Sequence, residues 1–296
     1  MLSILLIFAA ALFFSGIIVR TKSVCAGRRG PGIFQPLKDV VRLFRKGTVY
    51  STSSTVIFRV APLVYMASVL MAVACIPFGS RPGLISFEGD FVFFAYVLSL
   101  GKFFCIIAAL DTASSFEGMG ASRESFYSML AEPAFFLIMG SLALITGNTS
   151  FSGIFASLQT YGSFFGFGAA LVMAVLLLLV SMIENSRLPI DDPKTHLELT
   201  MIHEVMILDN SGFDLGLILS TGYLKFAMYG AVIANLFLCG STACSVGIFA
   251  LVQVLCAVAI GLTESFMARF RMNHNPEFIF SLSAAAFIIL FTIVNL

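Results

Sequence analysis

Several ionisable side chains lie within, or at the ends of, long apolar segments of this 296-residue chain. A charged group inside a bilayer costs about 2.5–3.5 kcal/mol or more, so such residues face a protein interior or a water-filled cavity, where they often mark an ion pathway. A single residue of this kind is equally well explained as half of a structural ion pair, or as a side chain that reaches the membrane surface. For the whole group we favour a buried polar route made of Lys102, Asp111, Glu132, Glu184, Lys225 and Glu264.

Glu132 stands out in this group because Pro133 follows it directly. A proline inside a helix removes one backbone donor and frees a carbonyl one turn earlier. The freed carbonyl needs another partner, such as water, at membrane depth. A carboxylate in that setting could bind and release a proton.

The stretch ENSRLPIDDPKTHLELTMIHEVMILDNSG, residues 184 to 212, gathers further charged groups between two apolar segments. From Thr195 to Asp209 its apolar residues recur at helical spacing, which predicts a helix. We favour a helix packed between the membrane domain and a partner protein; the alternative is an amphipathic helix on the membrane surface. Its candidate coupling residues are Arg187, Asp191, Asp192, Glu198, Glu204 and Asp209.

His196 and His203 lie on one flank of this predicted helix and are candidate interface residues. They are seven residues apart, which is two helical turns or about 10 Å, too far for one metal ion. The six cysteines are scattered and form no CxxC pair, so they indicate neither a metal site nor a disulfide framework. We therefore expect no cofactor in this chain, and any redox centre in a partner.

The composition indicates how these residues must be positioned. The chain is 59% hydrophobic and only 11% charged, which excludes an ordinary water-soluble domain. The first 20 residues lack a basic start and a small-residue cleavage site, so they are predicted to form a retained first helix. We predict an all-α polytopic membrane protein forming one domain, residues 1–296, with eight spans near 2–20, 57–78, 91–113, 126–147, 164–184, 215–239, 242–263 and 277–296.

Lysine and arginine are distributed unevenly between the predicted loops. The first, third, fifth and seventh loops hold most of them, whereas the opposite loops hold only Arg81. By the positive-inside rule both termini face outward and the basic loops face the cytoplasm. The acidic stretch after residue 184 is therefore expected to be cytoplasmic.

The basic first loop, SVCAGRRGPGIFQPLKDVVRLFRKG, has two interpretations. Its cations could bind anionic membrane lipid. Alternatively, its amphipathic segment QPLKDVVRLF seats a partner subunit. The candidate interface residues of the loop are Arg28, Arg29, Gln35, Pro36 and Asp39. GRRGPG matches neither a Walker A nor a dinucleotide motif, and we expect no nucleic-acid partner.

The loop just described, the segment SRESFYSMLAEP and the stretch 184–212 together carry a family resemblance. They resemble the complex I subunit 1 family of NADH:quinone oxidoreductase membrane subunits, and most closely the membrane subunit of group 4 membrane-bound [NiFe] hydrogenases of the formate hydrogenlyase subunit 4 type. Family motif positions are matched by Gly30, Pro31, Gln35, Pro36, Asp39, Arg123, Glu132, Glu184, Arg187, Pro189, Asp191, Glu198 and Asp209. Asn185, Ser186 and Ile190 depart from the quinone-type pattern, and Glu264 stands where that branch tends to have arginine.

The resemblance implies a subunit without a catalytic centre of its own, in a bacterial or archaeal cytoplasmic membrane. It would anchor a hydrogenase large subunit with a [NiFe] centre, a small subunit and other subunits with iron–sulfur clusters, and join them to antiporter-like membrane subunits. We expect charge changes in the loop to pass through Arg187 and Glu184 to Glu132, and on toward Asp111 or Lys102. The alternatives are a quinone-chamber subunit of complex I and an independent transporter.

Overall fold

A computed structural model describes the chain except residues 161–163, 193–200, 239–240 and 296, together with the side chains of residues 160 and 164–167. The described residues form helices and loops, with one isolated β-bridge between Phe78 and Arg81. The long helices are α1 Leu2–Cys25, α3 Val56–Cys75, α4 Asp90–Asp111, α5 Ser115–Thr146, α7 Phe164–Glu184, α9 Gly212–Asn235, α10 Thr242–Phe266 and α11 Asn275–Val294. The short ones are α2 Gln35–Phe44, α6 Phe151–Thr160, α8 His203–Met206 and the 3-10 helix Met272–His274.

The eight predicted spans correspond to the eight long helices. Among the described residues, seven helices are long and apolar enough to cross a membrane, and the described part of α7, Gly168–Glu184, is a shorter apolar helix. The chain is therefore a multi-pass helical membrane protein, as predicted. The main difference is α5, which begins at Ser115, although the sequence predicts its span from residue 126. Its first turns carry charged residues that lower the hydropathy, but Glu117 and Glu124 are buried, so the helix continues inside the protein.

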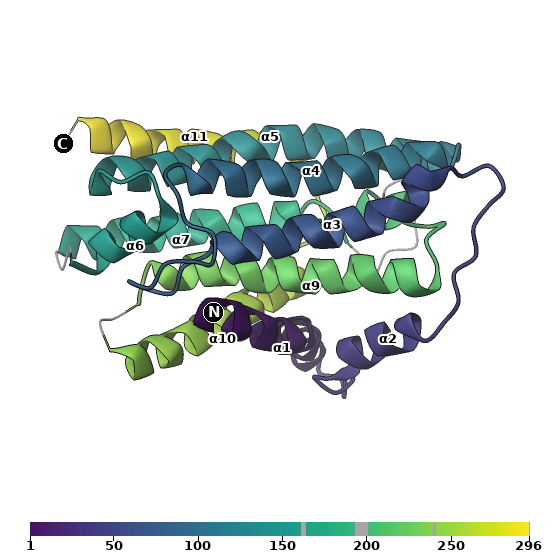
Figure 1. The fold of residues 1–296 in the computed structure, drawn as a ribbon, viewed down its shortest axis with the longest axis horizontal. Helices are drawn as coiled ribbons and strands as arrows, with labels where there is room; N and C mark the ends of the chain where they lie inside the picture. Colours follow the sequence, from purple (N-terminus) through teal and green to yellow (C-terminus); the bar gives the residue numbers. More distant parts are fainter. Residues whose placement is uncertain (161–163, 193–200, 239–240, 296) are drawn as a thin grey trace.

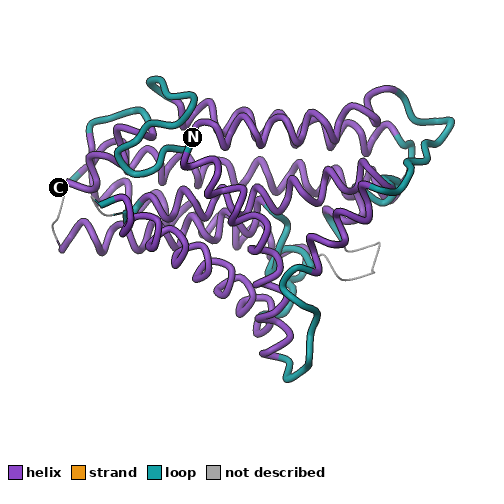
Figure 2. The backbone as a smooth tube through the Cα atoms, turned by 60° about the horizontal axis from the view of Figure 1, so that its bottom comes forward, coloured by secondary structure: helices purple, strands orange, loops and turns teal. Residues whose placement is uncertain are grey.

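The long helices form one bundle with α9 near its centre. In the apolar part of α9, 78% of the residues are buried inside the protein, which is the highest share among the candidate spans. α9 packs against α1, α3, α7 and α10, while α5 packs against α4, α7 and α11 (Figure 1). The helices run roughly along the long axis, and loops gather at the two ends of the bundle (Figure 2). Polar residues on the inward faces of α4, α5, α7 and α9 are thus brought together.

The first loop lies tightly against the bundle. A Cβ atom at Gly16 of α1 would lie 1.8 Å from the carbonyl oxygen of Ile33, so only glycine permits this contact. At the start of α9, Gly212 has φ of +54°, and a Cβ there would lie 2.3 Å from the carbonyl oxygen of Gly47. These two glycines allow the loop segments before and after α2 to lie directly against α1 and α9. The prediction that QPLKDVVRLF forms an amphipathic helix is confirmed, with Val40 buried.

The segment after α7 does not form the single helix from Thr195 to Asp209 that its spacing predicts. Residues 193–200, including His196 and Glu198, lie outside the described residues. Over residues 201–209 the prediction is wrong, because helix is confined to α8. Oδ2 of Asp191 accepts the N–H groups of Ile202 and His203, each at 3.1 Å. A continuous helix would donate these groups to its own carbonyls, so the carboxylate starts a new, short turn.

Candidate functional site

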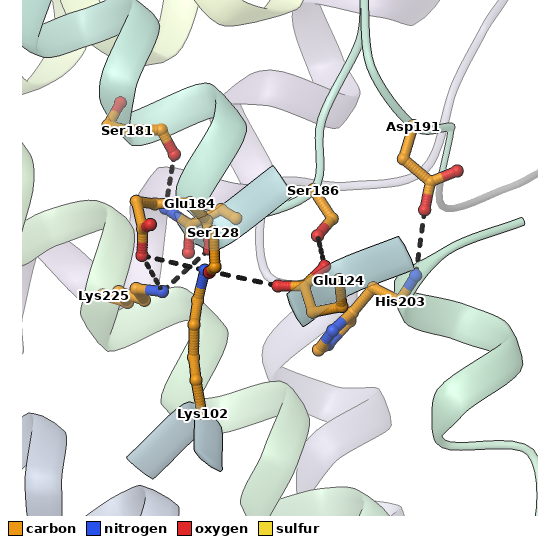
Figure 3. A network of polar contacts seen from close by, with 10 residues as sticks. Lys102, Glu124, Ser128, Ser181, Glu184, Ser186, Asp191, His203 and Lys225 are labelled. Atoms are coloured by element: carbon orange, nitrogen blue, oxygen red, sulfur yellow. Dashed lines mark hydrogen bonds and ion pairs between the residues drawn. The ribbon is translucent and has the colours of Figure 1, made fainter. Parts of the chain in front are cut away.

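Four charged side chains from four helices meet inside the bundle (Figure 3). They are Lys102 of α4, Glu124 of α5, Glu184 at the end of α7 and Lys225 of α9, and we call them the charge quartet. Nζ of Lys102 lies 3.3 Å from Oε1 of Glu124 and 3.0 Å from Oε2 of Glu184. It also donates a hydrogen bond to the Ser128 hydroxyl at 2.5 Å.

Lys225 completes the quartet by pairing with Glu184. Its Nζ lies 2.9 Å from Oε2 of Glu184 and 2.7 Å from the main-chain carbonyl oxygen of Glu184. The side chain of Lys225 is 1% exposed. The other oxygen of Glu124, Oε2, accepts a hydrogen bond from the Ser186 hydroxyl at 3.1 Å. Two carboxylates therefore face two ammonium groups, and the quartet is electrically balanced when all four are ionised.

Glu124 and Ser128 are not among the predicted site residues, although their spacing carries a signal. Glu124, Ser128 and Glu132 are spaced by four residues, so they lie along one face of α5. Glu124 lies outside the predicted span from residue 126, and for this reason it is not among the predicted intramembrane charges. The structure brings Lys102, Glu184 and Lys225 together and adds Glu124 as their fourth member.

Two cavities meet at the quartet. The first cavity is lined by loop residues Arg187, His203 and Glu204, and by Lys102, Glu124 and Glu184 of the bundle, among others. The second cavity is lined by Glu132, Ser125 and Ser128 on α5 and by Phe94 and Tyr229. Lys102 and Glu184 line both cavities. The ion pair between these two residues therefore forms part of the wall that separates the cavities.

Asp191 fixes the loop beside the first cavity. Its Oδ1 atom pairs with the Arg269 guanidinium at 2.9 Å, and its Oδ2 atom accepts the N–H groups at the start of α8. Burial raises the pKa of Asp191, while Arg269 and the two backbone donors oppose that shift. Asp192 donates its N–H to Oδ1 of Asp191 at 3.0 Å. This carboxylate thus sets the position of His203.

His203 lies beside Glu124 at the wall of the first cavity (Figure 3). Burial lowers the pKa of His203, and the charges of Lys225, Lys102 and Arg187 lower it further. The carboxylate of Glu124 acts in the opposite direction, and the net shift is downward. His203 is therefore neutral at neutral pH, and acidification would place a new positive charge next to the quartet.

This shift predicts a pH-dependent stability. The unfolded chain would bind a proton at His203 near its ordinary pKa of about 6.5, whereas the folded chain binds it only at lower pH. Stability is therefore expected to fall as pH drops below about 6.5 toward the lowered folded pKa. In the His203→Gln variant this loss should be smaller. The measurement is the midpoint of heat inactivation of the purified complex at about pH 7.5 and about pH 5.5, for the wild type and for His203→Gln. An equal loss of stability on acidification in the wild type and the variant would contradict the prediction.

Arg187 and Glu264 belong to a second ion-pair group. NH1 of Arg187 lies 3.1 Å from Oε1 of Glu264, and Nζ of Lys22 lies 2.8 Å from Oε2. The side chain of Glu264 is fully buried. The Arg187 guanidinium also lies over the ring of Phe226, 5.0 Å from its centroid. We call Lys22, Arg187 and Glu264 the α1/α10 clasp, because it ties α1, α10 and the loop after α7. From the sequence alone, Lys22 is only one of the cations that indicate topology.

Other predicted residues lie away from the quartet. Asp111 accepts hydrogen bonds from the N–H and the hydroxyl of Thr55, at 2.7 and 2.8 Å, and so holds the start of α3. Arg123 donates to the carbonyl of Met201 at 3.0 Å. Asp209 is exposed, and its N–H donates at 2.8 Å to buried Glu117, a further acidic residue that sequence analysis missed.

The candidate interface residues of the first loop differ in exposure. Arg28, Arg29 and Asp39 are exposed, whereas Gln35 and Pro36, in the first turn of α2, are half-buried. Within α2, Gln35 donates to Asp39 at 2.9 Å. Over the part of the chain that the structure describes, no three His, Cys, Asp or Glu side chains are grouped to hold a metal ion. The five described cysteines are free thiols, and Cys239 lies outside the described residues.

Fold and site together define a multi-pass helical membrane protein that buries a balanced cluster of charges beside a structured loop. Residues 1–295 match the family described as NADH dehydrogenase, and the chain belongs to this family. The resemblance predicted from the sequence is thereby confirmed.

Relatives in two branches of the family are similar to this chain. Hydrogenase-4 component C of Escherichia coli (strain K12) is 31% identical over 290 residues, covering 93% of this chain and 90% of the relative. Formate hydrogenlyase subunit 4 of the same strain is 26% identical over 282 residues, covering 92% and 91%. One subunit of the NADH-quinone oxidoreductase of Rickettsia prowazekii (strain Madrid E) is 27% identical over 220 residues, covering 72% and 64%.

One solved structure supports the fold. A chain of the membrane-bound sulfane sulfur reductase, an archaeal respiratory membrane complex, superposes with a TM-score of 0.81. The alignment covers 97% of this chain and 98% of that chain at 20% sequence identity. At this identity the likeness concerns the fold.

Proposed function

We propose that this chain is the membrane-anchoring and ion-coupling subunit of a membrane-bound [NiFe] hydrogenase complex of the formate hydrogenlyase kind. The names of two relatives, hydrogenase-4 component C and formate hydrogenlyase subunit 4, support this choice. The observation that carries the coupling role is the position of Lys102, which binds Glu124 and Glu184 between two cavities. Such a bridge could pass a proton from one cavity to the other.

In this proposal the basic loops face the cytoplasm and both termini face outward, as the distribution of lysine and arginine predicts. The partners are a large hydrogenase subunit with the [NiFe] centre, a small subunit and further subunits with iron–sulfur clusters, and antiporter-like membrane subunits. The hydrophilic subunits would dock on the loop after α7 and on the exposed residues Arg28 and Arg29 of the first loop.

Electron transfer in the docked subunits would act on the loop through charge. At an effective dielectric constant near 20, one unit charge about 8 Å away changes an ionisation by about 2 kcal/mol, or about 1.5 pKa units. The groups of the loop that would respond are Asp191, His203 and Glu204. Since His203 lies beside Glu124, such a change would alter the proton affinity of the quartet.

The relay can be written with balanced protons. A proton entering from the first cavity binds Glu124, which leaves Lys102 held by Glu184 and Ser128 and gives the quartet one excess positive charge. This excess favours loss of a proton from Lys102 into the second cavity, toward Glu132. Transfer of the proton from Glu124 to Lys102 then restores the starting state. One proton has moved from the first cavity to the second.

A quinone-chamber subunit is the second candidate. It is favoured by the first cavity, which Tyr223, Phe226 and Arg187 help to line, and by the similarity to the NADH-quinone oxidoreductase subunit of Rickettsia prowazekii. The α1/α10 clasp argues against it, because Glu264 neutralises Arg187 at the wall of that cavity. Purifying the complex and assaying it for nickel, hydrogen evolution and quinone reduction separates the two candidates.

The coupling role is tested with Glu124→Gln and Glu132→Gln. Each complex is reconstituted in liposomes, and proton translocation is measured per hydrogen molecule evolved. Both variants are expected to lower this ratio about tenfold or more, because a relay carboxylate cannot be replaced by an amide. The matched control is Glu277→Gln, whose side chain is 74% exposed and which should behave as wild type. An unchanged ratio in Glu124→Gln would overturn the proposed relay.

A further inference from the structure

We propose that the charge quartet makes this route selective for protons over sodium ions, because the ammonium groups of Lys102 and Lys225 occupy the places a sodium ion would need. The proposal deepens the coupling role proposed above and rests on it. It identifies the coupling ion of this chain, and it makes Lys102 the residue that determines the specificity.

The first argument is the use of oxygen atoms. A hard cation is held by oxygen ligands such as carboxylates, carbonyls and hydroxyls. In the quartet, Oε2 of Glu184 lies 3.0 Å from Nζ of Lys102 and 2.9 Å from Nζ of Lys225. Oε1 of Glu124 lies 3.3 Å from Nζ of Lys102, and its Oε2 accepts from Ser186. These three oxygens already have cationic or hydroxyl partners, so a sodium ion that used them would compete with the two ammonium groups.

The second argument is charge. Two carboxylates and two ammonium groups sum to zero, and the side chains are 1–12% exposed. A sodium ion added to this cluster would give a buried excess positive charge, which is unfavourable in a medium of low dielectric constant. A proton differs, because the excess charge that it brings to Glu124 is removed when Lys102 gives up a proton, whereas a sodium ion has no such exit and would stay in the cluster as an additional cation.

The third argument is the surroundings of Glu132, the next carboxylate on the route. Glu132 lines the second cavity together with Ser125 and Ser128, which are oxygen ligands of the kind sodium accepts. Lys102 lines the same cavity and donates to Ser128 at 2.5 Å. The ammonium group of Lys102 therefore contacts both the quartet carboxylates and this cavity, and it repels a metal cation that approaches either.

Removing Lys102 should therefore create a sodium site. In Lys102→Ala, two carboxylates keep one ammonium group, and the shortened side chain leaves space beside both carboxylates. The matched variant Lys102→Met has the same loss of charge but fills most of the space. The probe is sodium chloride, compared with choline chloride at equal ionic strength, and the readout is the midpoint of heat inactivation of the complete purified complex.

We expect equal midpoints for the wild-type complex in the two salts. In Lys102→Ala sodium should raise the midpoint by about 2 °C or more, since a ligand that binds the folded state stabilises it. In Lys102→Met the shift should be smaller. A sodium-specific shift in the wild-type complex, or none in Lys102→Ala, would overturn the proposal.

A second measurement does not depend on how the variants fold. Wild-type complex in liposomes is expected to translocate protons at the same rate with sodium or with choline as the only added cation, and to take up no radioactive sodium. A requirement for sodium would overturn the proposed selectivity while leaving a coupling role in place. Conversely, unchanged coupling in Glu124→Gln would overturn the relay, whereas a sodium-specific shift in Lys102→Ala that is absent from the wild-type complex would still support the exclusion of sodium by Lys102.

Discussion

Lys225→Met is expected to lose about 3–5 kcal/mol of folding stability, because it leaves the buried quartet with one uncompensated negative charge. Lys225 is the most deeply buried cation of the quartet, with its side chain 1% exposed. Methionine is similar in length, so packing changes little while the ammonium contact to the carboxylate and to the carbonyl of Glu184 is lost. The yield and heat-inactivation midpoint of the purified complex measure the effect.

The double variant Lys225→Met/Glu184→Gln separates charge from packing. It removes one charge of each sign, so the quartet is neutral again with Lys102 and Glu124. We expect it to recover a large part of the stability that Lys225→Met loses. Lys38→Met in the exposed part of α2 is the matched control, and it should stay within about 0.5 kcal/mol of wild type. Wild-type stability in Lys225→Met alone would contradict the structural role of the ion pair.

The sequence predicts the spans, because hydropathy and helix length depend on local composition. It also indicates Lys102, Glu184 and Lys225 as site residues, since a charge at membrane depth needs a polar partner wherever it lies. The pairing itself depends on how α4, α7 and α9 pack against one another, which no spacing along the chain reveals. Glu124 was missed for a related reason. Its polar neighbours lower the hydropathy, so the predicted span starts after it.

Asp111 shows how position along a helix limits such predictions. It lies nine residues after Lys102 on α4, which at a rise of about 1.5 Å per residue is about 13 Å away. The sequence therefore allowed both residues to belong to one route. In the structure Asp111 instead accepts from Thr55 and holds the start of α3. Whether a carboxylate serves as a cap or as part of a cluster depends on the neighbouring segment, which only the fold supplies.

The end of α7 and the loop after it connect the charge quartet, the α1/α10 clasp and the Asp191–Arg269 ion pair through residues that are close in sequence. Glu184 belongs to the quartet, Ser186 donates to Glu124, Arg187 belongs to the α1/α10 clasp, and Asp191 pairs with Arg269. Because these residues lie within eight positions of one another, a displacement of the loop changes several pairs together. Docking or charge transfer at this loop would therefore reach the quartet through covalently connected residues and not through a long chain of separate contacts.

Charge reversal in the α1/α10 clasp is expected to have the other large effect. In Glu264→Arg, a buried cation would face Lys22 and Arg187 in place of the carboxylate that now pairs with both, at 2.8 and 3.1 Å. Like charges at such distances in a buried site repel strongly. We expect little or no folded complex, measured as the amount that elutes as one species from size-exclusion chromatography in mild detergent.

Adding Lys22→Glu to Glu264→Arg tests whether charge is the cause. The second substitution restores an opposite pair between α1 and α10, so the double variant is expected to recover a measurable part of the folded complex. Glu277→Arg, at a side chain that is 74% exposed, controls for the substitution itself and should give the wild-type amount. Recovery would mean that an ion pair between α1 and α10 stabilises this part of the bundle, whichever helix carries the positive charge. A wild-type yield from Glu264→Arg alone would mean that folding of this part of the bundle does not depend on the clasp.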